Sequence, residues 1–401
     1  MSKTVTDNTL QAIISHAKEY GFVFPSSEIY DGLSAVYDYG PYGSELKKNI
    51  RDYWWHSMTQ MHENIVGIDA AIFMHPTTWK ASGHVDNFSD PMIDNKDSQK
   101  RYRVDHLIEA KADSLRAAGA AAEADALLTQ MDQLLAAENF EALKNLLTEQ
   151  KITCSVSGTS NWTDVRQFNL MFSTEFGAVA SDNPDDNKVY LRPETAQGIF
   201  VNFLNVQKTA RMKIPFGIAQ TGKAFRNEIV ARQFIFRMRE FEQMEMQFFV
   251  RPGTQMEWYN YWKAERKRWH ESLGIPAEKL RYHDHVKLAH YADAACDIEY
   301  NFPIGFKEVE GIHSRTDFDL RNHQEYSKKK MQYFDAENDE NGKPYGNYIP
   351  YVIETSIGLD RTVMMVLSEA YEEQDLSTPE KPDSRVLLKF RSEEHTSELQ
   401  S

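Results

Sequence analysis

The pattern of apolar residues, together with turn signals and composition, predicts helices in several parts of the chain. A short amphipathic helix is expected over 7–20, and a longer one over 44–63 follows the turn sequence Tyr39-Gly-Pro-Tyr-Gly43. A helix rich in Trp and Tyr is expected over 254–272. Another should begin at Gly358, where apolar residues recur at helical spacing.

The segment 104–150 differs from its surroundings in composition. Ala, Leu, Glu and Gln dominate it, and its leucines stand near helical spacing. This pattern predicts a helical insertion within a larger domain. We expect it to pack on itself as an antiparallel hairpin, and a coiled-coil site for a partner is the alternative.

Short apolar runs separated by polar turns predict strands between 164 and 250. The runs are Lys213–Gln220, Gln233–Met238 and Met246–Val250, and Tyr348–Glu354 predicts one more strand. Because these strands do not alternate regularly with helices, the sequence favours an α+β fold with an antiparallel sheet over a doubly wound parallel sheet.

Composition and charge narrow the class of protein. The chain has 401 residues, 41% of them apolar, and carries 45 Lys and Arg against 60 Asp and Glu, a net charge of -15. This balance argues against a protein that coats nucleic acid or membrane. No stretch is apolar for long enough to span a bilayer, which predicts a cytoplasmic protein. Cys154 and Cys296 stand in no metal-binding spacing and are expected to be inert buried thiols, without structural zinc.

Two motifs resemble functional sites but lack an essential part. Gly217-Ile-Ala-Gln-Thr-Gly-Lys223 fits the skeleton of a phosphate loop, but Ala224 replaces the hydroxyl residue that holds magnesium. His283, Asp284, His285 and His290 could suggest a metal site. With no converging carboxylate or cysteine at ligand spacing, we interpret these histidines as exposed.

Arginines are concentrated just after the first of these motifs. Phe225-Arg-Asn-Glu228 and Phe236-Arg-Met-Arg-Glu-Phe241 are expected on two short paired strands. The arrangement fits either a salt-bridged hairpin or a binding site for phosphate and carboxylate groups. Downstream, Gly358-Leu-Asp-Arg361 places a glycine at a strand-to-helix junction and an arginine in the first helical turn, where a polyphosphate can bind.

The combination of these motifs resembles a known family. Phe225–Glu228 and Gly358–Arg361 resemble motifs 2 and 3 of class II aminoacyl-tRNA synthetases, and Gly40-Pro-Tyr-Gly43 with the helix after it resembles motif 1. Three further stretches, 79–85, 191–200 and 308–317, are similar to dimeric single-chain glycyl-tRNA synthetases. The resemblance implies a class II antiparallel sheet flanked by helices, a homodimer with motif 1 at its interface, and an enzyme that attaches glycine to tRNA(Gly) through a glycyl-adenylate.

The resemblance also implies roles for individual residues. Arg226, Glu228 and Arg361 would be catalytic, and Glu308 would hold Mg²⁺ through ATP. The residues that match the ATP site are Arg226, Asn227, Glu228, Phe236, Arg237, Met238, Arg239, Glu240, Phe241, Glu308, Val309, Gly358, Leu359, Asp360 and Arg361. Those that match the glycine site are Arg103, Glu194, Phe241, Glu242, Gln243, Met244, Glu245, Glu354, Thr355, Ser356, Ile357 and Gly358.

The end of the chain departs from the family. Arg391–Ser401 has no apolar period and resembles a reading frame through a common sequencing-library adapter, so we expect an artefact there. Residues 1–390 would then form the catalytic domain, with the anticodon-binding domain of the family absent. Such a chain should form the adenylate but select tRNA poorly.

Two other functions remain open from the sequence. The chain could hand an activated amino acid to an acceptor other than tRNA, or it could be a catalytically silent relative that binds ATP.

Overall fold

The computed structural model describes residues 7–177, 187–229, 233–286, 288–289, 291–377 and 383–390. The adapter-like tail Arg391–Ser401 and His290 lie outside these residues, so the interpretations placed on them stay predictions.

The chain divides into two compact units. The first comprises Met1–Ser82, Ser173–Arg226 and Arg232–Ser401, and the second comprises Gly83–Phe172 and Asn227–Ala231. No helix among the described residues is both long and apolar enough to cross a membrane.

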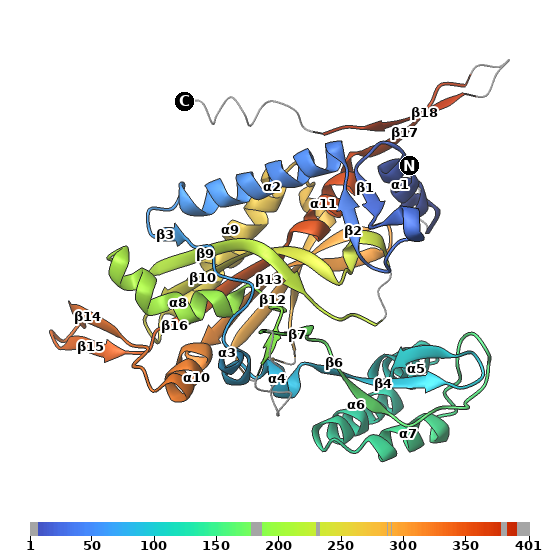
Figure 1. The fold of residues 1–401 in the computed structure, drawn as a ribbon, viewed down its shortest axis with the longest axis horizontal. Helices are drawn as coiled ribbons and strands as arrows, with labels where there is room; N and C mark the ends of the chain where they lie inside the picture. The colour runs from blue at the N-terminus through green and yellow to red at the C-terminus, as the bar shows by residue number, and fades with distance from the viewer. Residues whose placement is uncertain are drawn as a thin grey trace. The chain divides into compact units, whose positions relative to one another are not determined.

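A seven-stranded sheet forms the centre of the first unit, in the order β11-β12-β13-β16-β10-β9-β3 (Figure 1). Every pair of neighbours is antiparallel except β3 and β9, which are parallel. The α+β class and the antiparallel sheet are therefore confirmed. The strands are β3 (Ile65–Gly67), β9 (Phe216–Phe225), β10 (Glu240–Val250), β11 (Leu280–Asp284), β12 (Ala294–Phe302), β13 (Gly305–Thr316) and β16 (Tyr351–Gly358).

Helices cover both faces of this sheet (Figure 1). On one face lie α2 (Pro41–Thr59), α9 (Gln255–Ser272) and α11 (Leu359–Ala370), with α1 (Asp7–Glu19) against α11. The other face is partly covered by α8 (Ala196–Thr209) and α10 (Phe318–Ser327). All four helices predicted in this unit are confirmed, and α2 begins three residues early because Pro41 occupies its first turn.

Short elements complete the first unit. They are β1 (Val23–Pro25) paired with β2 (Tyr37–Tyr39), η1 (Glu28–Tyr30), α3 (Pro76–Ala81), β7 (Ser173–Glu175) paired with β8 (Lys188–Tyr190), η2 (Phe234–Phe236), η3 (Ala277–Lys279), β14 (Tyr333–Asn338) paired with β15 (Pro344–Tyr348), and β17 (Tyr371–Asp375) paired with β18 (Ser384–Leu388).

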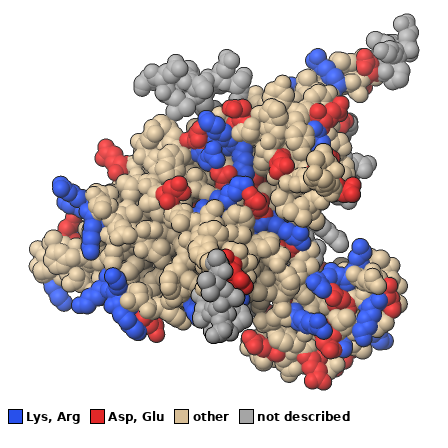
Figure 2. Space-filling model, viewed as in Figure 1, with Lys and Arg blue, Asp and Glu red and all other residues tan. Residues whose placement is uncertain are grey.

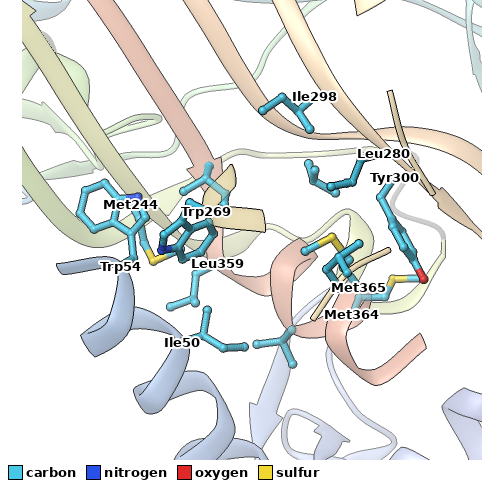
Figure 3. Close-up of a cluster of buried hydrophobic side chains, with 14 of the residues drawn as sticks. Ile50, Trp54, Met244, Trp269, Leu280, Ile298, Tyr300, Leu359, Met364 and Met365 are labelled. Atoms are coloured by element: carbon cyan, nitrogen blue, oxygen red, sulfur yellow. The ribbon is translucent and has the colours of Figure 1, made fainter. Parts of the chain in front are cut away.

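The main hydrophobic core lies between the sheet and the helices α2, α9 and α11. Burial of large apolar side chains removes water from this layer and supplies most of the driving force for folding. Figure 3 shows part of it, with side chains contributed by helices and strands far apart in sequence: Ile50, Trp54, Met244, Trp269, Leu280, Ile298, Tyr300, Leu359, Met364 and Met365.

One predicted strand is wrong. The segment Gln233–Met238 contains the 3-10 helix η2, and Gln233 and Phe234 have φ of 74° and 58°. Such left-handed backbone does not continue a strand. The ladder of β9 and β10 therefore ends at the pair Phe225 and Glu240. Arg226 and the segment Phe236–Arg239 lie in the connection between the two strands.

The Gly217–Lys223 motif lies wholly within β9, which confirms that it is not a phosphate loop.

The second unit combines a small sheet with a helical layer. The sheet has the order β5-β4-β6, and the helices pack on one another around Ile108, Leu127 and Leu146. The insertion is therefore self-packed, but it contains three helices where a hairpin was predicted. The elements are α4 (His84–Asn87), β4 (Ser89–Asn95), β5 (Lys100–Arg103), α5 (Val104–Ala117), α6 (Ala121–Ala136), α7 (Phe140–Glu149) and β6 (Arg166–Asn169).

Both cysteines are buried and free, as expected. Burial raises the pKa of the Cys154 thiol, but hydrogen bonds from Ser157, Ser98 and Tyr102 outweigh it and lower the pKa to about 6. Burial raises the pKa of Cys296 to about 11. The expectation that both cysteines are buried is therefore confirmed, and the expectation that both thiols are inert stays a prediction.

Lys, Arg, Asp and Glu are interspersed on the molecular face in Figure 2. A cluster of three polar side chains, Arg266, His270 and Glu310, lies instead inside the core, between α9 and β13. Glu310 accepts hydrogen bonds from Arg266 Nε at 2.6 Å and His270 Nε2 at 2.7 Å, and all three side chains are buried. Burial raises the pKa of Glu310, but the charge of Arg266 and the bond from His270 lower it below its usual value. The strand and helix are thus joined by a buried charge pair.

We expect Glu310→Leu to lower the free energy of unfolding by about 3–5 kcal/mol, because it leaves the Arg266 guanidinium buried without its counter-charge. Urea unfolding at neutral pH measures this. The double variant Arg266→Met/Glu310→Leu removes both charges and should recover most of the loss. A double variant no more stable than the single one would show that the charge pair is not the cause.

Candidate functional site

The register of three central strands places polar side chains on one face of the sheet. Gln247 pairs with Glu354, and Glu245 pairs with Ser356, across β10 and β16. On the other side of β16, His313 of β13 pairs with Glu354. Paired residues point to the same face of a sheet. These side chains therefore form a polar surface on one face of the sheet. The hydrophobic core lies on the opposite face, between the sheet and α2, α9 and α11.

Two buried carboxylates are joined by a single amide on this surface. Gln247 Nε2 donates to Glu245 Oε1 at 3.0 Å and to Glu354 Oε2 at 2.8 Å. Thr195 Oγ1 donates to the other oxygen of Glu245. Glu245 is 2% exposed and Glu354 5% exposed. The pair lies out of water, where two adjacent negative charges repel strongly.

The two carboxyl groups differ in charge. Burial raises the pKa of Glu245 well above its usual value, and the charges of Glu354 and Glu194 raise it further. Burial also raises the pKa of Glu354, but Arg315 and the hydrogen bond from His313 outweigh it and lower that pKa. The pKa values of the two groups are therefore shifted in opposite directions, so Glu354 ionises first and Glu245 is the more readily protonated of the pair.

An arginine outside the expected set supports Glu354. Arg315 Nη1 donates to Glu354 Oε2 at 3.0 Å, and its other nitrogens donate to Asp319 at 2.8 and 3.1 Å. Gln197 Nε2 connects Asp319 to Glu194, at 3.0 and 3.1 Å. Arg315 stands inside the motif stretch 308–317, so the sequence contained it but gave no reason to assign it a role. Gln197 and His313 likewise stand inside the motif stretches 191–200 and 308–317 without an assigned role, while Asp319 and Gln247 carried no signal.

Arginines and a third carboxylate lie beside this pair. Arg361 Nη1 is 3.1 Å from Glu308 Oε2, and its guanidinium covers the ring of Phe236 at 4.5 Å. Arg226 donates to the Pro193 carbonyl at 3.0 Å and lies 5.3 Å from the Phe241 ring. Burial raises the pKa of Glu308, but the charges of Arg361, Arg226 and His313 outweigh it and lower that pKa. His313 also contacts Glu354. It therefore connects the pair Glu245 and Glu354 to the group formed by Glu308, Arg361 and Arg226.

Other residues expected in the site lie on the core side. Asp360 accepts hydrogen bonds from Tyr39 at 2.5 Å, Lys47 at 2.7 Å and the Glu242 backbone at 2.7 Å. The Glu242 carboxylate pairs with Lys47 and Arg51 of α2. These contacts fasten α2 to the sheet. The side chains packed in the core or buried on its face are Met238, Met244, Val309, Thr355, Ile357 and Leu359.

The remaining expected residues of the first unit lie around these groups. Gln243 Nε2 donates to Ser356 Oγ at 3.3 Å, and Arg239 Nη1 donates to the Ser34 carbonyl at 3.1 Å. Glu240 pairs with Lys223 across β9 and β10. Gly358 precedes α11 as its N-cap, with extended backbone.

Three expected residues belong to the second unit and are described with it. Arg103 pairs with Asp90 at 2.9 Å and with Asp105 at 2.5 Å. The charge of Glu228 acts on both Arg103 and Asp90. The Asn227 backbone donates to the Leu170 carbonyl at 2.7 Å. Motif 2 is therefore divided between the units, immediately after Arg226.

Across the described residues no three His, Cys, Asp or Glu side chains converge on one metal ion. The expectation that the chain has no structural zinc stays a prediction. His283 and His285 are paired with Glu299 at 3.2 Å and Asp297 at 2.8 Å. They are partly exposed, so the expectation of exposed histidines holds, but each has a carboxylate partner.

Comparison with known proteins agrees with this geometry. Residues 90–122 and 116–170 match the glycyl-tRNA synthetase insertion domain 1, and residues 172–370 match the class II core domain of tRNA synthetases (G, H, P, S and T). A glycine–tRNA ligase of Chlorobaculum tepidum is 56% identical over 383 residues, which cover 95% of the chain and 79% of that relative. Those of Macrococcus caseolyticus and Treponema denticola are each 50% identical, over 96% and 95% of the chain and 79% and 75% of the relative.

The antiparallel sheet matches the class II core domain, and the second unit matches the insertion domain of glycyl-tRNA synthetases. These glycine–tRNA ligases are 50–56% identical over most of the chain. The chain therefore belongs to the glycine–tRNA ligase family of class II aminoacyl-tRNA synthetases.

Proposed function

We propose that the chain attaches glycine to tRNA(Gly) in two steps, through a glycyl-adenylate. The family accounts for the overall reaction, and the proposal concerns the route and the residues. The observation that supports it best is the adjacency of two groups on the polar face of one sheet. Glu245 and Glu354 suit an ammonium ion, while Arg226, Glu308 and Arg361 suit a polyphosphate with its metal.

Both steps transfer a group without a side-chain nucleophile. A glycine carboxylate oxygen attacks the α-phosphorus of ATP, the bond to the bridging oxygen breaks, and pyrophosphate leaves. A ribose hydroxyl of the terminal adenosine of tRNA then attacks the glycyl carbonyl carbon, and AMP leaves. Arg226 would bind the α-phosphate and the glycine carboxylate together. It would hold the reacting atoms in line and stabilise the charge that builds between them.

The other arginines would bind the outer phosphates. Arg361 and Arg237 are suited to this because a planar guanidinium binds phosphate with two parallel hydrogen bonds. Phe241 would stack on adenine, and Glu228 would contact its edge. Glu308 fits a position beside Mg²⁺, since its side chain is 48% exposed and one carboxylate oxygen already balances Arg361. When bound, the metal would neutralise phosphate charge.

The glycine pocket would select by charge and by size. Glycine has only an ammonium and a carboxylate to recognise, so the carboxylates around the ammonium supply affinity. Glu354 and Glu194 would do this, together with Glu245 once it ionises. Every competing amino acid is larger, so a site closed to one methyl group excludes them all. We assign Gln243 and Ser356 to this boundary.

The same proposal covers the assembly and location of the protein. An apolar groove of about 1050 Å³ runs along α2, between that helix, α11 and the segment Ser272–Ile275. We propose that a second copy covers it to form a homodimer, in a cytoplasmic enzyme. Tyr42 lines the groove and is 67% exposed.

We expect Arg226→Ala to reduce glycine-dependent ATP–pyrophosphate exchange by about a thousandfold, because it removes the donor to the charge that develops in the first step. Circular dichroism should show an unchanged fold. The matched control is Arg116→Ala, which removes an exposed arginine of α5. Near-normal exchange in Arg226→Ala would remove this residue from the catalytic role.

Glycine binding should release the proton of Glu245, because an arriving ammonium favours the ionised form. A raised carboxyl pKa means that Glu245 keeps its proton to a higher pH than an ordinary glutamate, so the KM for glycine should fall as pH rises through that raised pKa, by up to about tenfold per unit. Glu245→Gln cannot ionise and should abolish this dependence. An unchanged pH profile in Glu245→Gln would contradict the assignment.

Sedimentation velocity tests the dimer. Tyr42→Asp places a charge in the groove and should shift the protein from dimer to monomer, because a buried unpaired charge is costly at an interface. Tyr30→Asp is the matched control, since Tyr30 is 79% exposed and does not line the groove. A monomeric native chain would refute the proposal.

A further inference from the structure

Glu354 has almost no free hydrogen-bonding capacity. His313 Nδ1 lies 2.9 Å from Oε1, while Gln247 Nε2 and Arg315 Nη1 donate to Oε2 at 2.8 and 3.0 Å. An ionised carboxylate offers about four acceptor positions, and three are taken. One position on Oε1 is left for a ligand. We propose that His313 and Gln247 are positioning residues that hold Glu354 for the glycine ammonium, an inference that rests on the proposed glycine-binding role of Glu354.

The backbone and a second ring fix the position of His313. A Cβ atom built on Gly311 would lie only 2.8 Å from the His313 Cε1 atom. The imidazole therefore lies over the space that the missing side chain of Gly311 leaves open. The ring of His285 meets it edge-on at 6.0 Å, and His285 is held by Asp297 at 2.8 Å. His313 is 18% exposed on its side chain. Its ring is held on two sides and not merely solvated.

The hydrogen bond also fixes which nitrogen of His313 carries hydrogen. An ionised carboxylate only accepts, so Nδ1 must donate to Glu354. The bond restrains the rotation of the carboxylate at Oε1 in the same way that Gln247 and Arg315 restrain it at Oε2. A charged group held by several donors loses little freedom when its ligand arrives.

Gln247 restrains the carboxylate from the opposite strand. Its side chain is fully buried, and its Nε2 spans Glu245 and Glu354. Its Oε1 accepts no hydrogen bond from a described residue. The orientation of the amide is therefore set by the two carboxylates. Because one amide nitrogen donates to both groups, Gln247 fixes the spacing between the Glu245 and Glu354 carboxyl groups.

Glycine-dependent ATP–pyrophosphate exchange tests the proposal through the KM values for glycine and for ATP. His313→Ala and Gln247→Met each remove a donor to a charged group, and each should raise the KM for glycine about tenfold. The KM for ATP should stay within about twofold. His313→Asn places an amide nitrogen near the Nδ1 position and should restore the KM for glycine to within about threefold of the native value. The matched control is His283→Ala, which removes a more exposed histidine from β11 and should leave both KM values unchanged.

A double-mutant cycle separates positioning from a general structural role. Glu354→Gln should raise the KM for glycine about a hundredfold on its own. If His313 acts through Glu354, adding His313→Ala to that variant should change the KM by less than about twofold. A structural role would instead lower activity in both backgrounds.

Each contrary outcome has a distinct meaning. If Glu354→Gln raises the KM for glycine while His313→Ala and Gln247→Met leave it unchanged, the positioning proposal is overturned and the proposed function stands. An equal effect of His313→Ala in the native and Glu354→Gln backgrounds also overturns it. If Glu354→Gln leaves the KM unchanged, Glu354 does not bind glycine, and the proposed site fails first.

Discussion

The strand register of β10, β13 and β16 is the constraint on which the rest of this structure depends. Alternation along each strand assigns every second side chain to the core and the others to the polar surface. On β10, Met244 and Met246 enter the core while Glu245 and Gln247 face the opposite side. A slip of one residue would exchange the two sets. The hydrophobic core therefore holds the site in register.

Charge is buried on both faces of the sheet, in two different ways. On the core face, Glu310 is matched by Arg266 and His270, which gives a closed group with its charge balanced inside the protein. On the polar face, Glu354 is balanced by Arg315 and His313, but burial and the charges of Glu354 and Glu194 raise the pKa of Glu245. The first arrangement joins a helix to a strand. The second leaves a region that a cation can complete.

The sequence predicted the elements better than it predicted the contacts. A turn sequence located α2, composition located α9, and apolar spacing located α11. The motif sequences located Arg226, Glu308 and Arg361. The strand at Gln233–Met238 was wrong because left-handed backbone at Gln233 and Phe234 has no signature in apolar spacing. Glu242 and Glu245 look equivalent along the chain, yet one pairs with α2 and the other lies in the candidate glycine site. Only the register distinguishes them. His313 and Gln247 were missed because their roles come from pairing with a strand that follows much later.

The central claim is that this polar surface activates glycine with ATP. Amino-acid-dependent ATP–pyrophosphate exchange on the intact chain, with each of the common amino acids in turn and no tRNA present, tests it most directly. The account predicts exchange with glycine, at a rate at least about a hundredfold above that with alanine, because the pocket reads charge and excludes a methyl group. A well-folded protein without glycine-dependent exchange, or one that exchanges equally well with alanine, would contradict it.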